Sequence, residues 1–215
     1  MRPTPPPNPL ALLRTVRGLR PSAPADDPIR DKILDAATAQ FEKIGIARAT
    51  MNDVTRAAGL ARMTLYRRFA NKKELVEAAL LREVASFLAD LQQELHSHET
   101  LEDKLTEGFV FTVDTLRDHT LLNRLLETEP EETVPYFTVQ ATSLIATAAE
   151  VLAGEISQAV PDERSHEEIL VVAELTVRLV ISFVLTPSTT IDLDDPEVAR
   201  AFARNHLGPL LDGPT

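Results

Sequence analysis

The side chains in this sequence best suited to a binding chemistry are cations and hydroxyls gathered between residues 48 and 72. An arginine can hold a guanine edge through two hydrogen bonds, apolar groups can touch a thymine methyl, and hydroxyls or lysines bind phosphate oxygens. This mixture is typical of a surface that recognises duplex DNA. The candidate DNA contacts are Arg48, Thr50, Arg62, Met63, Thr64, Tyr66, Arg67 and Lys72.

The order of these residues divides their expected roles. Arg62, Met63 and Thr64 would open a short helix, and the N-terminal residues of such a helix are the ones that reach base edges in a major groove. Phosphates are expected at the remaining hydroxyls and at Lys72, which begins the next helix, where free backbone N–H groups also attract an anion. The plain alternative is a helical hairpin whose arginines are merely solvated.

Residues 50–69 have the pattern of a helix-turn-helix that would present this cluster. Thr50 can cap the first helix, with Asp53 three residues later, and Gly59 supplies the left-handed conformation that a tight turn needs. The spacing predicts a second helix over residues 62–68. The residues expected to face inward are Val54, Ala57, Leu65 and Phe69.

Residues 29–76 resemble the N-terminal domain of the tetracycline-repressor (TetR) family. The resemblance rests on Phe41, Gly45, Ala58-Gly59-Leu60 and the string Thr64-Leu65-Tyr66-x-x-Phe69-x-x-Lys72-x-Glu74-Leu75. It implies an all-α, nine-helix architecture and a homodimer joined through the last two helices. It also implies a palindromic operator and repression that is relieved by a ligand bound in the C-terminal domain. Ala61 departs from the family pattern, which often has Ser or Thr at this helix cap.

The charge distribution supports DNA binding although the net charge is −11. Residues 1–73 carry 14 Lys/Arg against 6 Asp/Glu, a net of +8, whereas the remainder carries 8 against 27, a net of −19. A basic front suits one end that meets a polyanion. An enzyme is the rival class. However, the chain has no cysteine, no glycine-rich phosphate loop and no metal-ligand spacing, and we expect neither catalytic residues, nor a metal, nor a cofactor.

The chain as a whole is predicted to be helical, without strands. Residues 1–27 are expected to form a basic, Pro-rich arm that adds phosphate or minor-groove contacts. The alternatives are a passive disordered tail or a misassigned start codon. Residues 28–73 form the DNA-binding domain, and residues 74–215 form the ligand-binding and dimerisation domain. Helices are predicted at residues 29–44, 50–58, 62–68, 71–96, 101–116, 120–127, 131–153 and 167–185, and from Asp195-Pro196 onward.

The helix predicted over residues 167–185 is apolar almost all round. A membrane span is the alternative, but Glu174 and Arg178 interrupt the run, and charges at mid-bilayer are costly. A helix buried on every side needs neighbours on every side, and some would belong to a second copy of the chain. We therefore expect a homodimer that does not enter a membrane and is cytoplasmic.

A small lipophilic effector, of acyl or lactone type, is expected because the chain has many aliphatic and few aromatic residues. The candidate ligand-binding residues are Phe109, Thr112, Leu116, Phe137, Gln140 and Arg178. Each has ordinary core packing as its alternative. For Arg178 the alternative is an i, i+4 ion pair with Glu174. An activator, or a regulator that responds to no ligand, remains the alternative to a ligand-released repressor.

Overall fold

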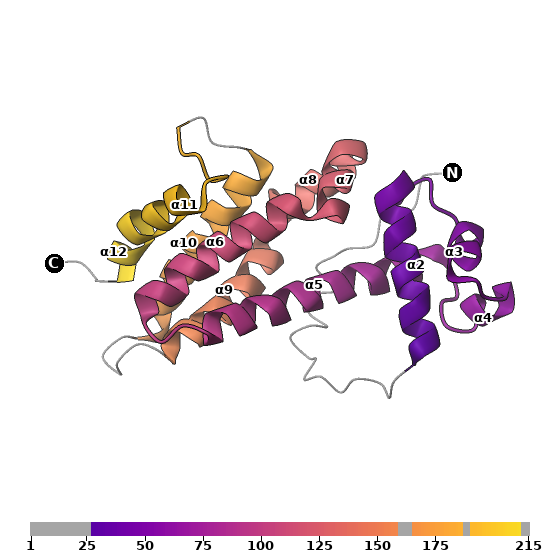
Figure 1. Cartoon of the computed structure of the whole chain (residues 1–215), viewed down its shortest axis with the longest axis horizontal. Coiled ribbons are helices and arrows are strands. Elements are labelled where there is room, and N and C mark those ends of the chain that lie inside the picture. The colour runs from indigo at the N-terminus through magenta and orange to yellow at the C-terminus, as the bar shows by residue number, and fades with distance from the viewer. Residues whose placement is uncertain (1–26, 159–164, 187–189, 212–215) are drawn as a thin grey trace. The chain divides into compact units, whose positions relative to one another are not determined.

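The computed structural model describes residues 27–158, 165–186 and 190–211, and within these residues every regular element is a helix (Figure 1). The predicted all-α class is confirmed. Contacts divide the chain into two compact units: Met1–Ser86 with Thr120–Gln140, and Phe87–His119 with Ala141–Thr215. This division differs from the predicted domain boundary after residue 73. The predicted N-terminal arm, apart from Asp27, lies outside the described residues.

The first unit begins with α2 (Pro28–Ile44), whose ends are set by local chemistry. The carboxylate of Asp27 accepts hydrogen bonds from the backbone N–H groups of Ile29 and Arg30, at 3.1 and 3.0 Å. Pro28 occupies the first turn, where a missing N–H costs nothing. The helix ends at Ile44 and is capped by Gly45, whose φ of 81° is accessible chiefly to glycine.

The predicted helix-turn-helix is present as α3 (Met51–Ala58) and α4 (Arg62–Tyr66). Thr50 and Asp53 form the expected reciprocal capping box, and Gly59 between the helices is left-handed, with φ 61° and ψ 36°. Two details of the prediction are wrong. The second helix ends at Tyr66 rather than residue 68, and Ala57 is exposed, whereas Ala58, one residue further round α3, is buried.

A single apolar core holds the first unit together. Residues of α2, α3 and α4 meet the start of α5 (Lys72–His96), and α7 (Thr120–Thr128) adds Leu121, which is 1% exposed. An ion pair of 2.7 Å between Arg82 and Asp35 ties α5 to α2. The largest fully buried side chains of this core are Phe41, Phe69, Ile33, Leu34, Leu65, Leu75, Leu121 and Val54.

The helix predicted over residues 131–153 is in fact two helices, α8 (Pro130–Phe137) and α9 (Thr142–Ser157). Pro135 lies within α8 and has no N–H to continue the helical ladder. Its carbonyl instead accepts from the N–H groups of Thr138 and Gln140, at 3.2 and 2.8 Å, which closes a turn. The prediction also ended this helix at Gly154, which α9 passes through.

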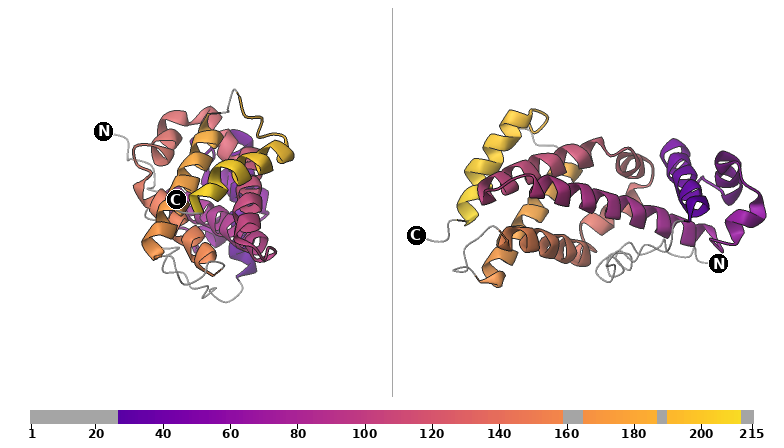
Figure 2. Two further views of the ribbon diagram at one scale, coloured as in Figure 1. Left: turned by 90° about the vertical axis from the view of Figure 1, so that its left-hand side faces the viewer. Right: turned by 60° about the horizontal axis from the view of Figure 1, so that its bottom comes forward.

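The second unit contains the rest of α5, α6 (Leu101–Asp118), α9, α10 (His166–Leu185) and α11 (Pro196–Phe202). The chain continues from α11 through a π-helical turn, η1 (Ala203–Leu207), into α12 (Gly208–Leu211). Helices α9 and α10 pack along one another, and α11 with η1 packs on α6 (Figure 2). The rings of Phe109, Phe183 and Phe202 meet at centroid distances of 5.4 to 6.3 Å.

Helix α10 is not buried on every side within one chain. Its buried face carries residues such as Val172, Ala173 and Val180. On its other face Val171 is 55% exposed and Leu175 is 43% exposed. Among the described residues, no helix is both long enough and apolar enough to span a membrane.

Candidate nucleic-acid interface

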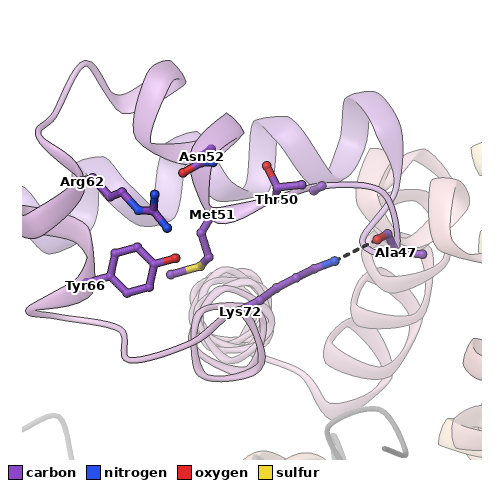
Figure 3. A pocket seen from close by; sticks show the side chains of 8 residues that line it. Ala47, Thr50, Met51, Asn52, Arg62, Tyr66 and Lys72 are labelled. Atoms are coloured by element: carbon purple, nitrogen blue, oxygen red, sulfur yellow. Dashed lines mark hydrogen bonds between the residues drawn. The ribbon is translucent and has the colours of Figure 1, made fainter. Parts of the chain in front are cut away.

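The helix-turn-helix carries a shallow, open hollow of about 310 Å³ on its surface. Figure 3 shows side chains from α3, from α4 and from the start of α5 around it. Four predicted DNA contacts, Thr50, Arg62, Tyr66 and Lys72, meet here. The complete lining is Ala47, Ala49, Thr50, Met51, Asn52, Arg62, Tyr66 and Lys72.

The other predicted DNA contacts lie outside the hollow. Met63, which is 72% exposed, and Arg67 project from α4 and its C-terminal end. Thr64 is half-buried on the same helix, and Arg48 is exposed in the loop from Gly45 to Thr50, hereafter the 45–50 loop. Four of the eight predicted contacts are therefore gathered round a single depression, and the other four belong to the same unit.

Helix α4 is seated by one fully buried side chain and displays most of the others. Leu65 is 0% exposed, and Phe69, just beyond the helix, is 2% exposed. Both pack into the core, so the opposite face turns to solvent. Arg62 and Tyr66 are both exposed, and the guanidinium carbon of Arg62 lies 5.2 Å from the centre of the Tyr66 ring. This geometry is a cation–π contact between two predicted DNA-binding residues.

An ion pair joins Arg68, two residues beyond the end of α4, to Asp27 at the N-cap of α2. Arg68 donates to the two carboxylate oxygens of Asp27 from Nε at 2.8 Å and from a terminal nitrogen at 3.1 Å. The hydrogen bond from Arg68 lowers the pKa of Asp27, and the same bond raises the pKa of Arg68. The guanidinium of Arg30 also stacks over Phe69, 5.5 Å from its centre. Arg68 therefore ties the end of α4 to the N-terminus of α2.

The hydroxyl of Thr50 is engaged in the cap of α3. It donates to the Asp53 carboxylate at 2.6 Å and accepts from the Asp53 N–H at 3.2 Å. The bond from Thr50 is the main cause of a lowered pKa of Asp53, with Arg56 adding to it. If the Thr50 hydroxyl is to donate a hydrogen bond to a phosphate, its present hydrogen bond to the Asp53 carboxylate must break.

Lys72 points across the hollow toward the 45–50 loop. Its Nζ donates to the carbonyl oxygen of Ala47 at 2.9 Å (Figure 3). Partial burial lowers the pKa of Lys72, and the negative charge of Glu129 acts in the opposite direction. The cation is thus held at the rim of the hollow by a backbone acceptor, where it remains in reach of an incoming phosphate.

The sequence analysis missed two residues of this region. Asn52 lies in the first turn of α3 and lines the hollow, so its amide can donate to a phosphate or a base. Its polar type next to the Thr50 cap was the available signal. Glu129 lies 82 residues from Ala47 in the sequence and bonds to it, and no local pattern indicated this contact.

The six predicted ligand-binding residues are divided between the two compact units. Phe109 is 2% exposed and packs against Phe183 and Phe202, and the Thr112 hydroxyl donates to the carbonyl of Gly108 at 2.7 Å. Leu116 packs against the same core. Phe137 and Gln140 belong to the other compact unit.

Arg178, the sixth of these residues, forms the ion pair that was its alternative. Its Nε donates to Glu174 at 2.8 Å, one turn earlier on α10. Both side chains are about half exposed. Across the described part of the chain, no group of three or more potential metal-ligating side chains comes together.

Comparison with known proteins decides the family. Residues 33–79 match the model described as "Bacterial regulatory proteins, tetR family", and residues 101–204 match "Bacterial Tetracyclin repressor, C-terminal domain". The chain belongs to the TetR family. The first match contains the helix-turn-helix and the hollow, whereas the second begins at α6 and includes Glu129.

Individual relatives match over part of the chain only. The chain is 39% identical over 69 residues to "HTH-type transcriptional regulator TtgR" of Pseudomonas putida, covering 32% of this chain and 29% of that protein. It is 29% identical over 101 residues to the "Probable acrEF/envCD operon repressor" of Escherichia coli (strain K12), covering 45% and 46%. The matched stretches thus span less than half of these relatives' length.

A solved structure matches over a longer range. The TetR family repressor AlkX from Dietzia sp. strain DQ12-45-1b is 26% identical, with a TM-score of 0.61. The match covers 85% of this chain and 95% of that one. The TetR architecture therefore extends through both compact units.

Proposed function

We propose that this TetR-family protein is a transcriptional repressor that binds a palindromic duplex operator as a homodimer and leaves it when a small lipophilic ligand binds. The observation that carries the proposal is the hollow between α3, α4 and α5. There two cations, Arg62 and Lys72, and two hydroxyls, Thr50 and Tyr66, converge on one exposed face.

The chemistry of this face favours DNA over another polyanion. Arg62, at the first position of α4, can read a guanine edge, while the exposed Met63 beside it can contact a thymine methyl. Lys72, Tyr66 and Thr50 around the rim can hold phosphates on either side of the groove. A helix that buries one face and displays cations at its N-terminal end has the geometry of a major-groove reader.

The homodimer is supported by the uncovered apolar face of α10. Val171 and Leu175 are one turn apart on this helix and both are exposed in the single chain. A second copy related by a two-fold axis would bury the same stripe on each subunit. Two reading helices separated by about 34–36 Å would then match successive major grooves of a palindrome.

The effector is assigned only by class. The buried residues of the second unit are mostly aliphatic, with Phe109 as the largest fully buried ring. The structurally similar AlkX is implicated in biodegradation of n-alkanes. Both observations favour an aliphatic ligand, such as an acyl chain or a lactone, and Phe109, Thr112 and Leu116 on α6 are the first residues to test as its contacts.

Genomic footprinting with the purified protein tests the central claim. The purified protein should protect a palindromic DNA sequence. Transcripts from the genes that flank this sequence should rise in a strain from which the gene for this protein is deleted. If the protein binds no duplex DNA even at low salt, the proposal fails. Falling transcripts would instead indicate an activator.

A matched lysine pair sharpens the test. Lys72 lines the hollow, whereas its neighbour Lys73 is exposed and lies near Glu77. Each lost phosphate contact lowers the dependence of log K on log salt by about 0.9. Lys72→Ala should therefore reduce the slope by about 1.8 in a dimer, at all sequences alike, and Lys73→Ala should leave it unchanged. Equal slopes for the two variants would remove Lys72 from the interface.

A further inference from the structure

Glu129 connects the turn between α7 and α8 to the 45–50 loop. Its Oε1 accepts a hydrogen bond from the backbone N–H of Ala47 at 2.7 Å. Glu129 stands at the N-cap position of α8, but its side chain makes no bond to that helix. The side chain thus does not cap its own helix and instead accepts a hydrogen bond from a loop far away in the sequence.

Local structure leaves Glu129 available for this contact. Pro130 follows it directly and has no N–H, so one of the donors at the start of α8 is absent. Thr128, on its other side, donates its hydroxyl to the carbonyl of Arg124 at 2.7 Å. The Glu129 carboxylate is thus free of bonds to its own helix and accepts a hydrogen bond from Ala47 instead.

Gly45 allows the turn to approach this closely. A Cβ at this position would lie 3.0 Å from Glu129 Oε1 and 3.3 Å from Thr128 Oγ1. The φ of Gly45 is 81°, a conformation that other residues rarely adopt. Both the backbone shape and the lack of a side chain therefore seat the α7–α8 turn against the beginning of the loop.

Ala47 is held on both of its polar backbone groups. Glu129 accepts from its N–H, and Lys72 donates to its carbonyl at 2.9 Å. Both are charge-assisted hydrogen bonds, which are stronger than neutral ones. The residues that follow, Arg48 and Thr50, are predicted DNA contacts, so the position of Ala47 sets where they stand.

We propose that Glu129 is a positioning residue for DNA binding, which holds the 45–50 loop in place from the α7–α8 turn. The inference deepens the proposed function and rests on it only where DNA affinity is concerned. Ala47 lies in the segment that matches the N-terminal family model, and Glu129 in the segment that matches the C-terminal one. The hydrogen bond therefore joins the α7–α8 turn to the loop that carries Arg48 and Thr50.

Two conservative variants separate reach from charge. Glu129→Asp keeps the charge but shortens the side chain by one methylene, whereas Glu129→Gln keeps the reach and an acceptor oxygen but loses the charge. Hydrogen–deuterium exchange of the full-length protein without DNA should be about tenfold faster in the 45–50 loop of the Asp variant, because a hydrogen bond to a charged group is lost. The Gln variant keeps the reach but only a neutral hydrogen bond, so its loop should exchange at a rate between those of the wild type and the Asp variant.

DNA affinity provides the second measurement, with the exposed Glu131 as matched control. On the operator fragment defined by footprinting, Glu129→Asp should weaken binding roughly five- to tenfold. Glu129→Gln should weaken binding less than Glu129→Asp does, and Glu131→Gln should not weaken it. If the Asp variant behaves as the wild type while both Gln variants change alike, the effect is charge alone and the inference is overturned.

The two proposals can fail separately. If the wild type binds no duplex but the Asp variant still loosens the 45–50 loop, the proposed function fails and the positioning role stands. If the wild type binds its operator and neither the loop exchange nor the affinity responds to Glu129→Asp, the positioning role fails and the proposed function stands.

Discussion

The guanidinium of Arg62 rests over the ring of Tyr66, one turn further along α4, with its central carbon 5.2 Å from the ring centre. The two residues have been assigned different partners, a base edge for Arg62 and a phosphate for Tyr66. Their contact makes them a unit, because the ring that carries the hydroxyl proposed to bind a phosphate also limits where the guanidinium can point.

Two substitutions of Tyr66 should separate these roles. Tyr66→Phe keeps the ring and should weaken binding to all sequences alike. Tyr66→Ala removes the ring as well, and a cation–π contact at an exposed site contributes ~0.5–1 kcal/mol. Preference for the base pair read by Arg62 should therefore fall by roughly two- to fivefold. Fluorescence anisotropy on the operator and on single-base variants measures both effects. Equal loss of preference in the Phe variant would contradict this division.

The features that the sequence predicted correctly are those set by neighbours in the chain. The Thr50–Asp53 capping box, the left-handed Gly59 and the Asp195 cap before Pro196 each involve residues within three positions of one another. Their geometry follows from side-chain type and spacing alone. The outward residues of α4 were predictable for the same reason, because Leu65 and Phe69 fix the buried face.

The features that the sequence did not predict depend on contacts between distant segments or on one overlooked residue. Pro135 signals a break in the helix predicted over residues 131–153 because it lacks a backbone N–H. The prediction followed the apolar spacing on both sides of Pro135 and did not include this break. The bond from Ala47 to Glu129 joins segments that only the fold brings together. The division of Phe137 from Phe109 between compact units has the same origin. The predicted ligand site therefore stays a prediction.

The missing cap of the recognition helix should be repairable. Ala61 stands at the N-cap of α4 with extended backbone, φ −70° and ψ 141°, and makes no side-chain cap bond. Ala61→Ser should stabilise the first unit by about 0.5–2 kcal/mol by satisfying a free N–H group. Both tyrosines of the chain, Tyr66 and Tyr136, lie in the first unit, so tyrosine fluorescence during urea unfolding reports this unit. Ala70→Ser, at an exposed position outside any helix, is the control and should change nothing.

The Asp27–Arg68 pair should make the first unit sensitive to acid. Because the hydrogen bond from Arg68 lowers the pKa of Asp27 below its ordinary value of 3.8, the stabilisation is complete above that value and is lost as the pH falls through the lowered pKa. Asp27→Asn retains a helix cap but not the ion pair. Its urea midpoint should be lower than that of the wild type at neutral pH, and the two should converge below pH 3.8.

Asp31→Asn provides the control for this titration. Asp31 lies in the first turn of the same helix, and its side chain is exposed. This variant should keep the wild-type loss of stability through the titration of Asp27. If Asp27→Asn and Asp31→Asn show the same pH dependence, the pair with Arg68 does not contribute to the acid response.

The exposed stripe on α10 should control assembly. Leu175, which is 43% exposed in one chain, would face its own symmetry mate in the proposed dimer, so Leu175→Glu places two carboxylates in an apolar contact. Central interface residues contribute on the order of 2–4 kcal/mol, and the dimer dissociation constant should rise ~30-fold or more.

Val139→Glu is the matched control, since Val139 is also apolar and is 85% exposed on the first unit. Sedimentation equilibrium should show monomers for the first variant alone. Because a monomer binds only one half-site, the Leu175→Glu variant should also lose operator binding. Its circular dichroism spectrum should match that of the wild type. A Leu175→Glu protein that remains dimeric at nanomolar concentration would place the subunit interface away from this face of α10.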